Sequence, residues 1–169
     1  MFMKLINILV FCALLFSASK VESLELNQDT HCLAQNIYFE AGNQPLAGKI
    51  AVVNVVLNRV EHDKFPNNVC DVVYQTKEWR TSWTGKTIPK LGMCQFSWFC
   101  DGKSDKPKDS KTWAESLQLA DDMLVKYVKS DNYLDLTEGA MWYHAYYIQP
   151  YWSHHLNETV QISAHIFYR

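Results

Sequence analysis

Apolar residues recur at helical spacing in three parts of the chain. In residues 46–60 they occupy one face at intervals of three or four, and Val52, Val55 and Val56 make the opposite face apolar as well. We therefore expect a central, buried helix here, with Pro45 at its first position. Residues 30–41 and 113–128 follow the same period, the latter with a charged opposite face. Both stretches are predicted to be helical.

The last third of the chain favours short strands. Residues 139–145 and 159–169 are each predicted to form one strand, because apolar and polar residues alternate there or aromatic residues dominate, and residues 150–152 are predicted to form a turn. Residues 77–93 predict an irregular loop, whereas the alternation in residues 94–102 predicts a hairpin strand. Helices first and strands later indicate an α+β fold.

One carboxylate lies on an apolar helix face. If residues 30–41 are helical, Glu40 sits about 20° from Leu33 around the helix axis, on the face that also holds Ile37. A glutamate in apolar surroundings has a raised pKa, because desolvation disfavours its charged form. A general acid at neutral pH needs that property. The alternative is a glutamate at the frayed end of a surface helix.

The N-terminus resembles an export signal. Lys4 precedes an apolar run in residues 5–16, and small residues follow before a cut after Ser23. We therefore predict a signal peptide in residues 1–23 and an exported mature chain of residues 24–169, periplasmic or extracellular. The apolar run is shorter than the roughly 20 residues of a spanning helix, so an uncleaved anchor is the weaker alternative. No stable membrane insertion is expected after cleavage.

The mature chain contains an even set of cysteines: Cys32, Cys70, Cys94 and Cys100. In an exported chain this favours disulfides, for which three connectivities are possible, and a Cys94–Cys100 pair closing a small loop is the preferred one. Zinc is the alternative, but no pair of cysteines has the two-residue spacing of a zinc site. We predict no metal and no cofactor.

Composition narrows the class of protein further. A chain of 169 residues is long enough for one domain with a proper core. The net charge of -2 gives no support to nucleic-acid binding, which needs a basic surface. The 9 Tyr, 8 Phe and 6 Trp could line an aromatic groove, although most should be core residues.

Several motifs resemble the SleB/CwlJ cell wall hydrolase family, and they occur in the family's order over nearly all of the mature chain. They are Glu40-Ala41, residues 48–60, Phe65-Pro66, residues 72–75, residues 94–98, residues 142–145, residues 150–152 and residues 165–168. The resemblance implies a small lysozyme-related, transglycosylase-like domain with a helical core and short strands. It also implies an enzyme, acting as a monomer, that cleaves peptidoglycan glycan strands between N-acetylmuramic acid and N-acetylglucosamine.

The resemblance assigns the family's catalytic glutamate to Glu40. The family's second acidic residue in that segment is replaced by Gln44, and its arginine by Gly42. Hydrolysis by the standard routes uses two carboxylates, whereas a lytic transglycosylase can work with one, because the C6 hydroxyl of muramic acid attacks its own anomeric carbon. The single glutamate therefore favours a lytic transglycosylase. Asp101 and Asp105 are weaker candidates for a second carboxylate.

Substrate contacts are predicted for five further residues. Gln95, Tyr143 and His144 are expected to hold the sugar and stabilise its developing positive charge, and Trp98 and Trp142 to stack on the glycan. Each could equally be a packed or surface residue.

Two other functions remain open. A metal-dependent amidase could use His144, His154 or His155, although the chain has no paired metal-ligand spacing. A noncatalytic glycan-binding module would use exposed tryptophans and would not need Glu40.

Overall fold

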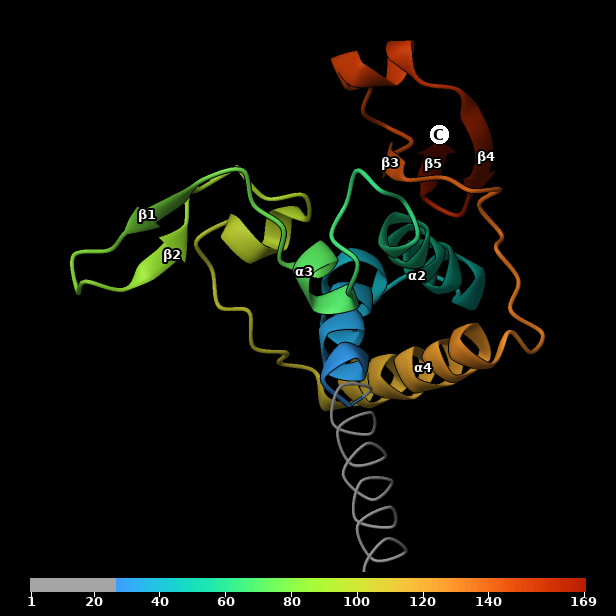
Figure 1. Ribbon diagram of the computed structural model, residues 1–169, viewed down its shortest axis with the longest axis horizontal. Helices are drawn as coiled ribbons and strands as arrows, with labels where there is room; N and C mark the ends of the chain where they lie inside the picture. The colour runs from blue at the N-terminus through green and yellow to red at the C-terminus, as the bar shows by residue number, and fades with distance from the viewer. Residues whose placement is uncertain (1–26) are drawn as a thin grey trace, which may run out of the picture.

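The computed structural model describes residues 27–169. The predicted signal peptide lies outside the described residues. Figure 1 shows a helical body, a small sheet that carries the C-terminus, and a two-stranded arm that projects from the body on the opposite side. This arrangement of helices and short strands is the α+β fold that the sequence predicts.

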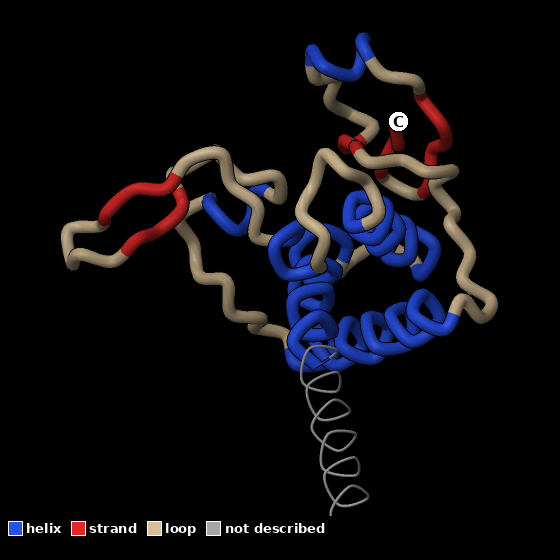
Figure 2. The backbone as a smooth tube through the Cα atoms, viewed as in Figure 1, coloured by secondary structure: helices blue, strands red, loops and turns tan. Residues whose placement is uncertain are grey.

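The helical body contains the N-terminal helix, which is helical over residues 27–41, together with α2 (Leu46–Val60), α3 (Val69–Val73) and α4 (Ser110–Lys129). The three helices predicted from periodicity are confirmed. Pro45 is the residue that precedes α2 and not its first residue. Helix α2 is buried on both faces, as its pattern predicts, and lies between α4 and the sheet (Figure 2). The core joins Leu33 and Ile37 to apolar residues of α2, α3 and α4.

Two disulfides fasten the body. Cys32 on the N-terminal helix is bonded to Cys70 on α3. Cys94 is bonded to Cys100, which confirms the predicted pair. The first bond holds the helix that carries Glu40 against α3.

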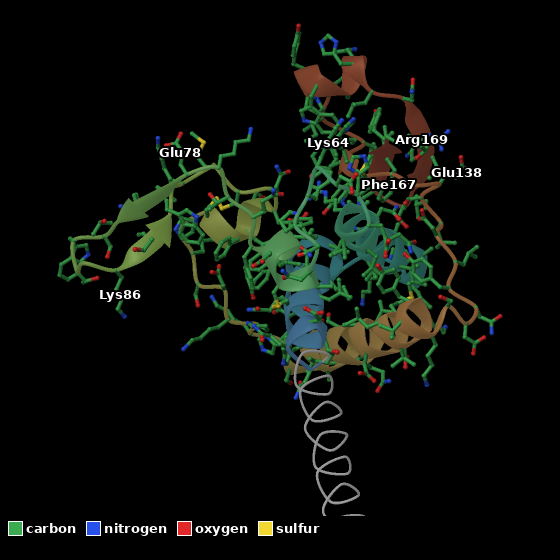
Figure 3. All side chains as sticks on the ribbon, viewed as in Figure 1. Lys64, Glu78, Lys86, Glu138, Phe167 and Arg169 are labelled. Carbon is green, nitrogen blue, oxygen red and sulfur yellow. A yellow bond between two sulfur atoms is a disulfide. The ribbon has the colours of Figure 1, made fainter. Side chains whose placement is uncertain are left out.

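The C-terminal sheet contains β3 (Trp142–Ala145), β5 (His165–Tyr168) and β4 (Glu158–Ile162), antiparallel and in that order. The prediction of one strand over residues 159–169 is wrong, because the chain reverses between β4 and β5 at Ser163, whose φ is 54°. Phe167 of β5 is fully buried against Ala51 and Val55 of α2. Figure 3 shows Phe167 where the sheet meets the helical body, on the far side of the molecule from Glu78 and Lys86 on the arm.

Polar side chains of α2 hold the segment that leads into the sheet. The Asn54 side chain bonds Tyr133, Leu134 and Leu136. Asn58 donates to Asp135, Thr137 and the carbonyl of Ala140. Since these bonds span residues 133–140, they fix where β3 begins. The polar residues of α2 thus position the sheet over the end of the N-terminal helix.

The arm and the segment after it differ from the prediction. Strands β1 (Trp79–Thr81) and β2 (Thr87–Pro89) form a hairpin where an irregular loop is predicted. Residues 94–102 do not form a strand, because Ser97–Cys100 is a 3-10 helix. The disulfide holds the Cα atoms of Cys94 and Cys100 6.0 Å apart, whereas an extended chain would span roughly 20 Å over six residues. Between Pro150 and Leu156 the predicted turn is a second 3-10 helix, Tyr151–His155.

Candidate active site

A pocket of about 570 Å³ lies between the helical body and the C-terminal sheet. Its lining comes from the end of the N-terminal helix, from α2, from the start of the first 3-10 helix and the residues just before it, from β3, β5 and the loop after β3, and from the second 3-10 helix. The polar and aromatic residues among them are Glu40, Arg59, Gln95, Phe96, Ser97, Trp142, Tyr143, His144, Tyr147, Trp152 and His165. Glu40 is the one carboxylate among all the described residues that line this pocket.

Glu40 is partly buried at the last turn of its helix. Burial raises the pKa of its carboxyl group above the ordinary value, although a hydrogen bond from Tyr143 and the positive charge of Arg59 act in the opposite direction. The hydrogen bond runs from the Tyr143 hydroxyl to Glu40 Oε2 at 2.9 Å. The C-terminal end of a helix also disfavours a negative charge. Burial and the helix end therefore both favour the protonated form of Glu40.

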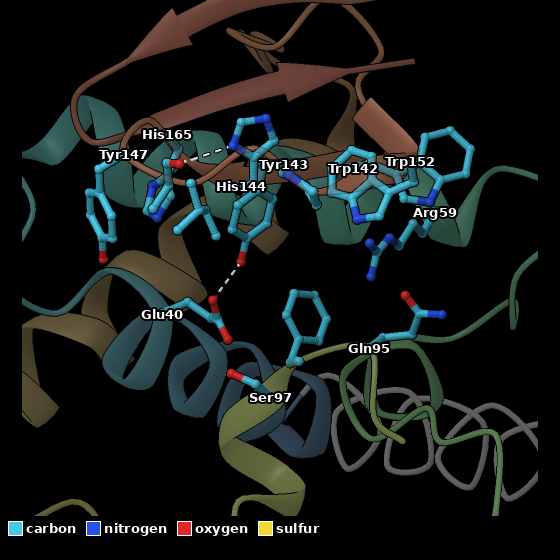
Figure 4. A pocket seen from close by; sticks show the side chains of 14 residues that line it. Glu40, Arg59, Gln95, Ser97, Trp142, Tyr143, His144, Tyr147, Trp152 and His165 are labelled. Carbon is cyan, nitrogen blue, oxygen red and sulfur yellow. Dashed lines mark hydrogen bonds between the residues drawn. The ribbon is translucent and has the colours of Figure 1, made fainter. Parts of the chain in front are cut away.

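Tyr143 reaches Glu40 from β3, as Figure 4 shows. Its ring packs against His165 and Phe167 of the neighbouring strand. Burial and the nearby Glu40 carboxylate raise the pKa of the Tyr143 hydroxyl well above its ordinary value. The hydroxyl thus stays protonated and donates to Glu40 in either charge state of the carboxyl group.

Replacing Tyr143 by Phe should extend activity to higher pH while lowering its maximum. The variant loses the hydrogen bond that favours the Glu40 carboxylate, so the pKa of Glu40 rises further. If protonated Glu40 is the acid, the alkaline limb of the pH–rate profile shifts upward. Rates from pH 4 to 9 on one glycan substrate, compared with wild type, test this. An alkaline limb that shifts to lower pH would contradict it.

Arg59 is a pocket residue that the sequence interpretation did not single out. The same helix face contains Val52, Val55 and Val56, and Arg59 itself is 4% exposed. Its Nε donates to the Met141 carbonyl at 2.8 Å. The sequence did contain a signal for Arg59: a charged residue on a face of apolar valines, which is the same kind of pattern that identified Glu40.

Gln95 and Trp142 line the pocket at positions that a glycan could contact. Gln95 is exposed at the pocket, and Figure 4 shows its side chain opposite Arg59. Trp142 is half-buried beside Trp152, a tryptophan of the second 3-10 helix that the sequence interpretation missed. The structure thus brings Glu40, Gln95, Trp142 and Tyr143 to one pocket.

Trp98 lines a second pocket next to Glu40, but it is largely buried and leaves little of its ring open for stacking. It is 7% exposed, its ring stacks on Phe39 at 4.8 Å, and its Nε1 donates to Asn36 Oδ1. Trp98 supports the helix that carries Glu40 from within the core.

His144 lines the first pocket, but both of its ring nitrogens contact protein groups. Nδ1 lies 2.9 Å from the Ala145 carbonyl and Nε2 lies 3.0 Å from the Tyr168 hydroxyl. Because both nitrogens bond within the protein, the buried ring connects β3 to β5 and offers neither nitrogen to a sugar.

Two further pockets adjoin the first and extend it in two directions. One, of about 450 Å³, shares Glu40 and Ser97 with it, and the other, of about 530 Å³, shares Gln95, Trp142 and Trp152. Glu40 therefore lies along a groove and not at the bottom of an isolated hole. An extended polymer is a better fit to such a groove than a small molecule.

The candidates for a second carboxylate lie in the adjoining pocket. Asp101 and Asp105 line the 450 Å³ pocket, where burial and the Asp101 charge raise the pKa of Asp105. Gln44, at the place of the family's second acidic residue, accepts a hydrogen bond from the backbone of Ala164. Its side chain joins the turn before α2 to the turn between β4 and β5.

Residues 27–169 contain no group of three His, Cys, Asp or Glu side chains that could hold a metal ion. Over the same residues, no helix has the length and apolar character needed to cross a bilayer.

The chain matches the profile of a family described as Cell Wall Hydrolase over residues 43–168. The match begins just after Glu40. The spore cortex-lytic enzyme of Bacillus subtilis (strain 168) is 41% identical over 49 residues, which are 29% of this chain and 16% of that enzyme. The spore cortex-lytic enzyme of Halalkalibacterium halodurans is 36% identical over 58 residues, or 34% of this chain and 18% of the relative. The chain therefore spans less than a fifth of the length of these curated relatives.

Two solved structures share the fold. The catalytic domain of the Bacillus cereus SleB protein superposes with a TM-score of 0.57 at 23% identity, covering 83% of this chain and 89% of that one. The catalytic domain of the germination-specific lytic transglycosylase SleB from Bacillus anthracis gives 0.56 at 22% identity, covering 83% and 93%. Because the family profile matches most of the chain, this protein belongs to the SleB/CwlJ-like cell wall hydrolase family.

Proposed function

We propose that this protein cleaves the glycan strand of peptidoglycan between N-acetylmuramic acid and N-acetylglucosamine, as a lytic transglycosylase with Glu40 as its single general acid and base. The observation that carries the proposal is the one carboxylate among the described lining residues of the pocket, held with a raised pKa along a groove. The similarity to cell wall hydrolases supplies the substrate class.

The proposed reaction begins with protonated Glu40. It gives its proton to the glycosidic oxygen, and the bond to the anomeric carbon of muramic acid breaks with oxocarbenium-like charge on that sugar. Glu40 is then a carboxylate, which the Tyr143 hydrogen bond and the Arg59 charge stabilise. The carboxylate takes the proton of the C6 hydroxyl as that oxygen attacks the anomeric carbon. Glu40 returns to its acid form, and the muramic acid leaves as a 1,6-anhydro sugar.

Groove residues would position the strand. Gln95 is exposed to donate to or accept from sugar hydroxyls, and Trp142 and Trp152 offer aromatic surface beside it. We propose that the protein acts outside the cytoplasm, in the periplasm or cell wall, and as a monomer. Two disulfides are in keeping with an oxidising compartment.

Mass spectrometry of purified peptidoglycan digested by the protein tests the proposal. The expected new ends are 1,6-anhydromuramic acid. Reducing muramic acid ends would show hydrolysis and contradict transglycosylation while keeping glycan cleavage. Freed stem peptides with intact glycan would instead indicate an amidase and overturn the assignment of Glu40.

A further inference from the structure

Arg59 is a buried cation without a carboxylate partner. Its guanidinium lies over the rings of Phe65 and Phe96, 5.2 and 5.0 Å from their centroids. Nε donates to the Met141 carbonyl, whereas Nη1 has no hydrogen-bond partner. Among the described residues, no carboxylate forms a salt bridge with Arg59 within 4.0 Å. A buried charge of this kind is costly unless an anion compensates it.

In the proposed reaction, Glu40 is neutral when substrate binds and so does not supply that anion. Burial lowers the pKa of Arg59 to about 10, so the guanidinium is still charged at neutral pH. The proposed reaction, however, begins with Glu40 protonated and therefore neutral. The positive charge of Arg59 is then unbalanced in a pocket whose other described lining residues include no acid. A negative group brought by the ligand would balance it.

The pocket limits which group this can be. Arg59 and Glu40 line the same pocket, and Figure 4 shows the guanidinium directed across it toward Gln95. An anion on a sugar close to the bond that is cleaved would therefore lie beside Arg59. Muramic acid carries a carboxyl group on the lactyl ether of its own ring. Stem peptides convert that carboxyl into an amide, which is neutral.

We propose that Arg59 binds the free lactyl carboxylate of muramic acid, so that the enzyme prefers glycan strands from which the stem peptides have been removed. The inference rests on the proposed function and specifies its substrate. A guanidinium binds a carboxylate through charge-assisted hydrogen bonds, which are about twice as strong as neutral ones. A preference for stripped strands places the protein after an amidase reaction, the class of reaction that frees lactyl carboxyl groups.

The test compares two strands that differ at the lactyl group, which is charged in one and neutral in the other. Peptidoglycan is stripped with an amidase, and half of it is coupled to methylamine with a carbodiimide, which turns each lactyl carboxylate into a neutral amide. Wild type should cleave the acid form with a kcat/KM at least roughly tenfold higher, a ratio that corresponds to about 1.4 kcal/mol. Equal rates on both strands would overturn the proposal without any variant being needed.

Variants locate the preference. Arg59→Met should bring the ratio of the two rates close to one, mainly by raising KM for the acid strand, and Arg59→Lys should keep part of the preference. Arg80→Met removes an exposed cation on β1 of the arm and should leave the ratio at its wild-type value. If the Arg59→Met protein is folded by circular dichroism and keeps the wild-type ratio, the carboxylate is bound elsewhere and the proposal is wrong.

A binding measurement separates this inference from the proposed function. Glu40→Gln protein should bind the acid strand about tenfold more tightly than the methylamide strand, and the added Arg59→Met change should remove that difference. Tight, charge-dependent binding without cleavage by wild type would contradict the proposed reaction but support the site. Cleavage with no charge dependence would support the proposed reaction but contradict the carboxylate site at Arg59.

Discussion

Replacing Glu40 by Gln is expected to reduce glycan cleavage by about a hundredfold to ten-thousandfold, which is the contribution of general acid–base catalysis. The amide has the size of the carboxyl group and can still accept the hydrogen bond from Tyr143, but it cannot donate a proton to the glycosidic oxygen. Fold and strand binding should be retained. Release of soluble muropeptides, together with a pull-down on insoluble peptidoglycan, measures both properties.

The same variant should be more stable than wild type at neutral pH. Because burial raises the pKa of Glu40 in the folded state, the folded protein binds more protons than the unfolded chain between the two pKa values. Wild type therefore loses stability as pH rises from the unfolded value of 4.5 through the higher folded value. Gln does not titrate, so the variant escapes this loss, and each unit of pKa shift corresponds to about 1.4 kcal/mol.

Thermal unfolding at pH 4 and pH 7 checks the sign. The gain of Glu40→Gln over wild type should be larger at pH 7 than at pH 4. Asp121→Asn is the matched control, because Asp121 is exposed on α4 and its change should leave cleavage unaltered. Full lytic activity in the Glu40 variant, or a stability gain confined to acid pH, would refute the role and the environment given to this residue.

The helices were predictable because each one buries a stripe that the sequence displays. Helix α2 shows apolar residues on both faces and is buried on both, and α4 shows one apolar face and buries that one. The position of Glu40 followed from the same geometry, since a residue seven places from Leu33 returns to the same face of a helix. Local periodicity therefore predicted both the scaffold and the candidate acid.

Features that depend on the third dimension could not be predicted in this way. The reversal at Ser163 lacks the Asn-Gly or Asp-Gly pair that usually indicates a tight hairpin. Trp98 and Trp152 are both aromatic residues in short 3-10 helices, and only the packing of the chain decides that the first is in the core and the second at the groove. In the sequence, Arg59 is one polar residue of α2 among several. Its burial depends on the segment around Met141 that packs beside it.

Removing the Cys32–Cys70 disulfide is expected to lower the free energy of unfolding by about 4 kcal/mol. The bond closes a loop with a sequence separation of 38, and the entropy that such a loop removes from the unfolded chain accounts for a stabilisation of this size. The Cys94–Cys100 bond spans only 6 residues, so the same relation gives about 2 kcal/mol.

Urea unfolding of the two double alanine variants compares these values. At 25 °C the Cys32→Ala/Cys70→Ala protein that is still folded should cleave glycan at nearly the wild-type rate, because the hydrogen bond from Tyr143 to Glu40 does not depend on the disulfide directly. Equal losses of stability in the two variants would show that loop length is not what makes the Cys32–Cys70 bond stabilising.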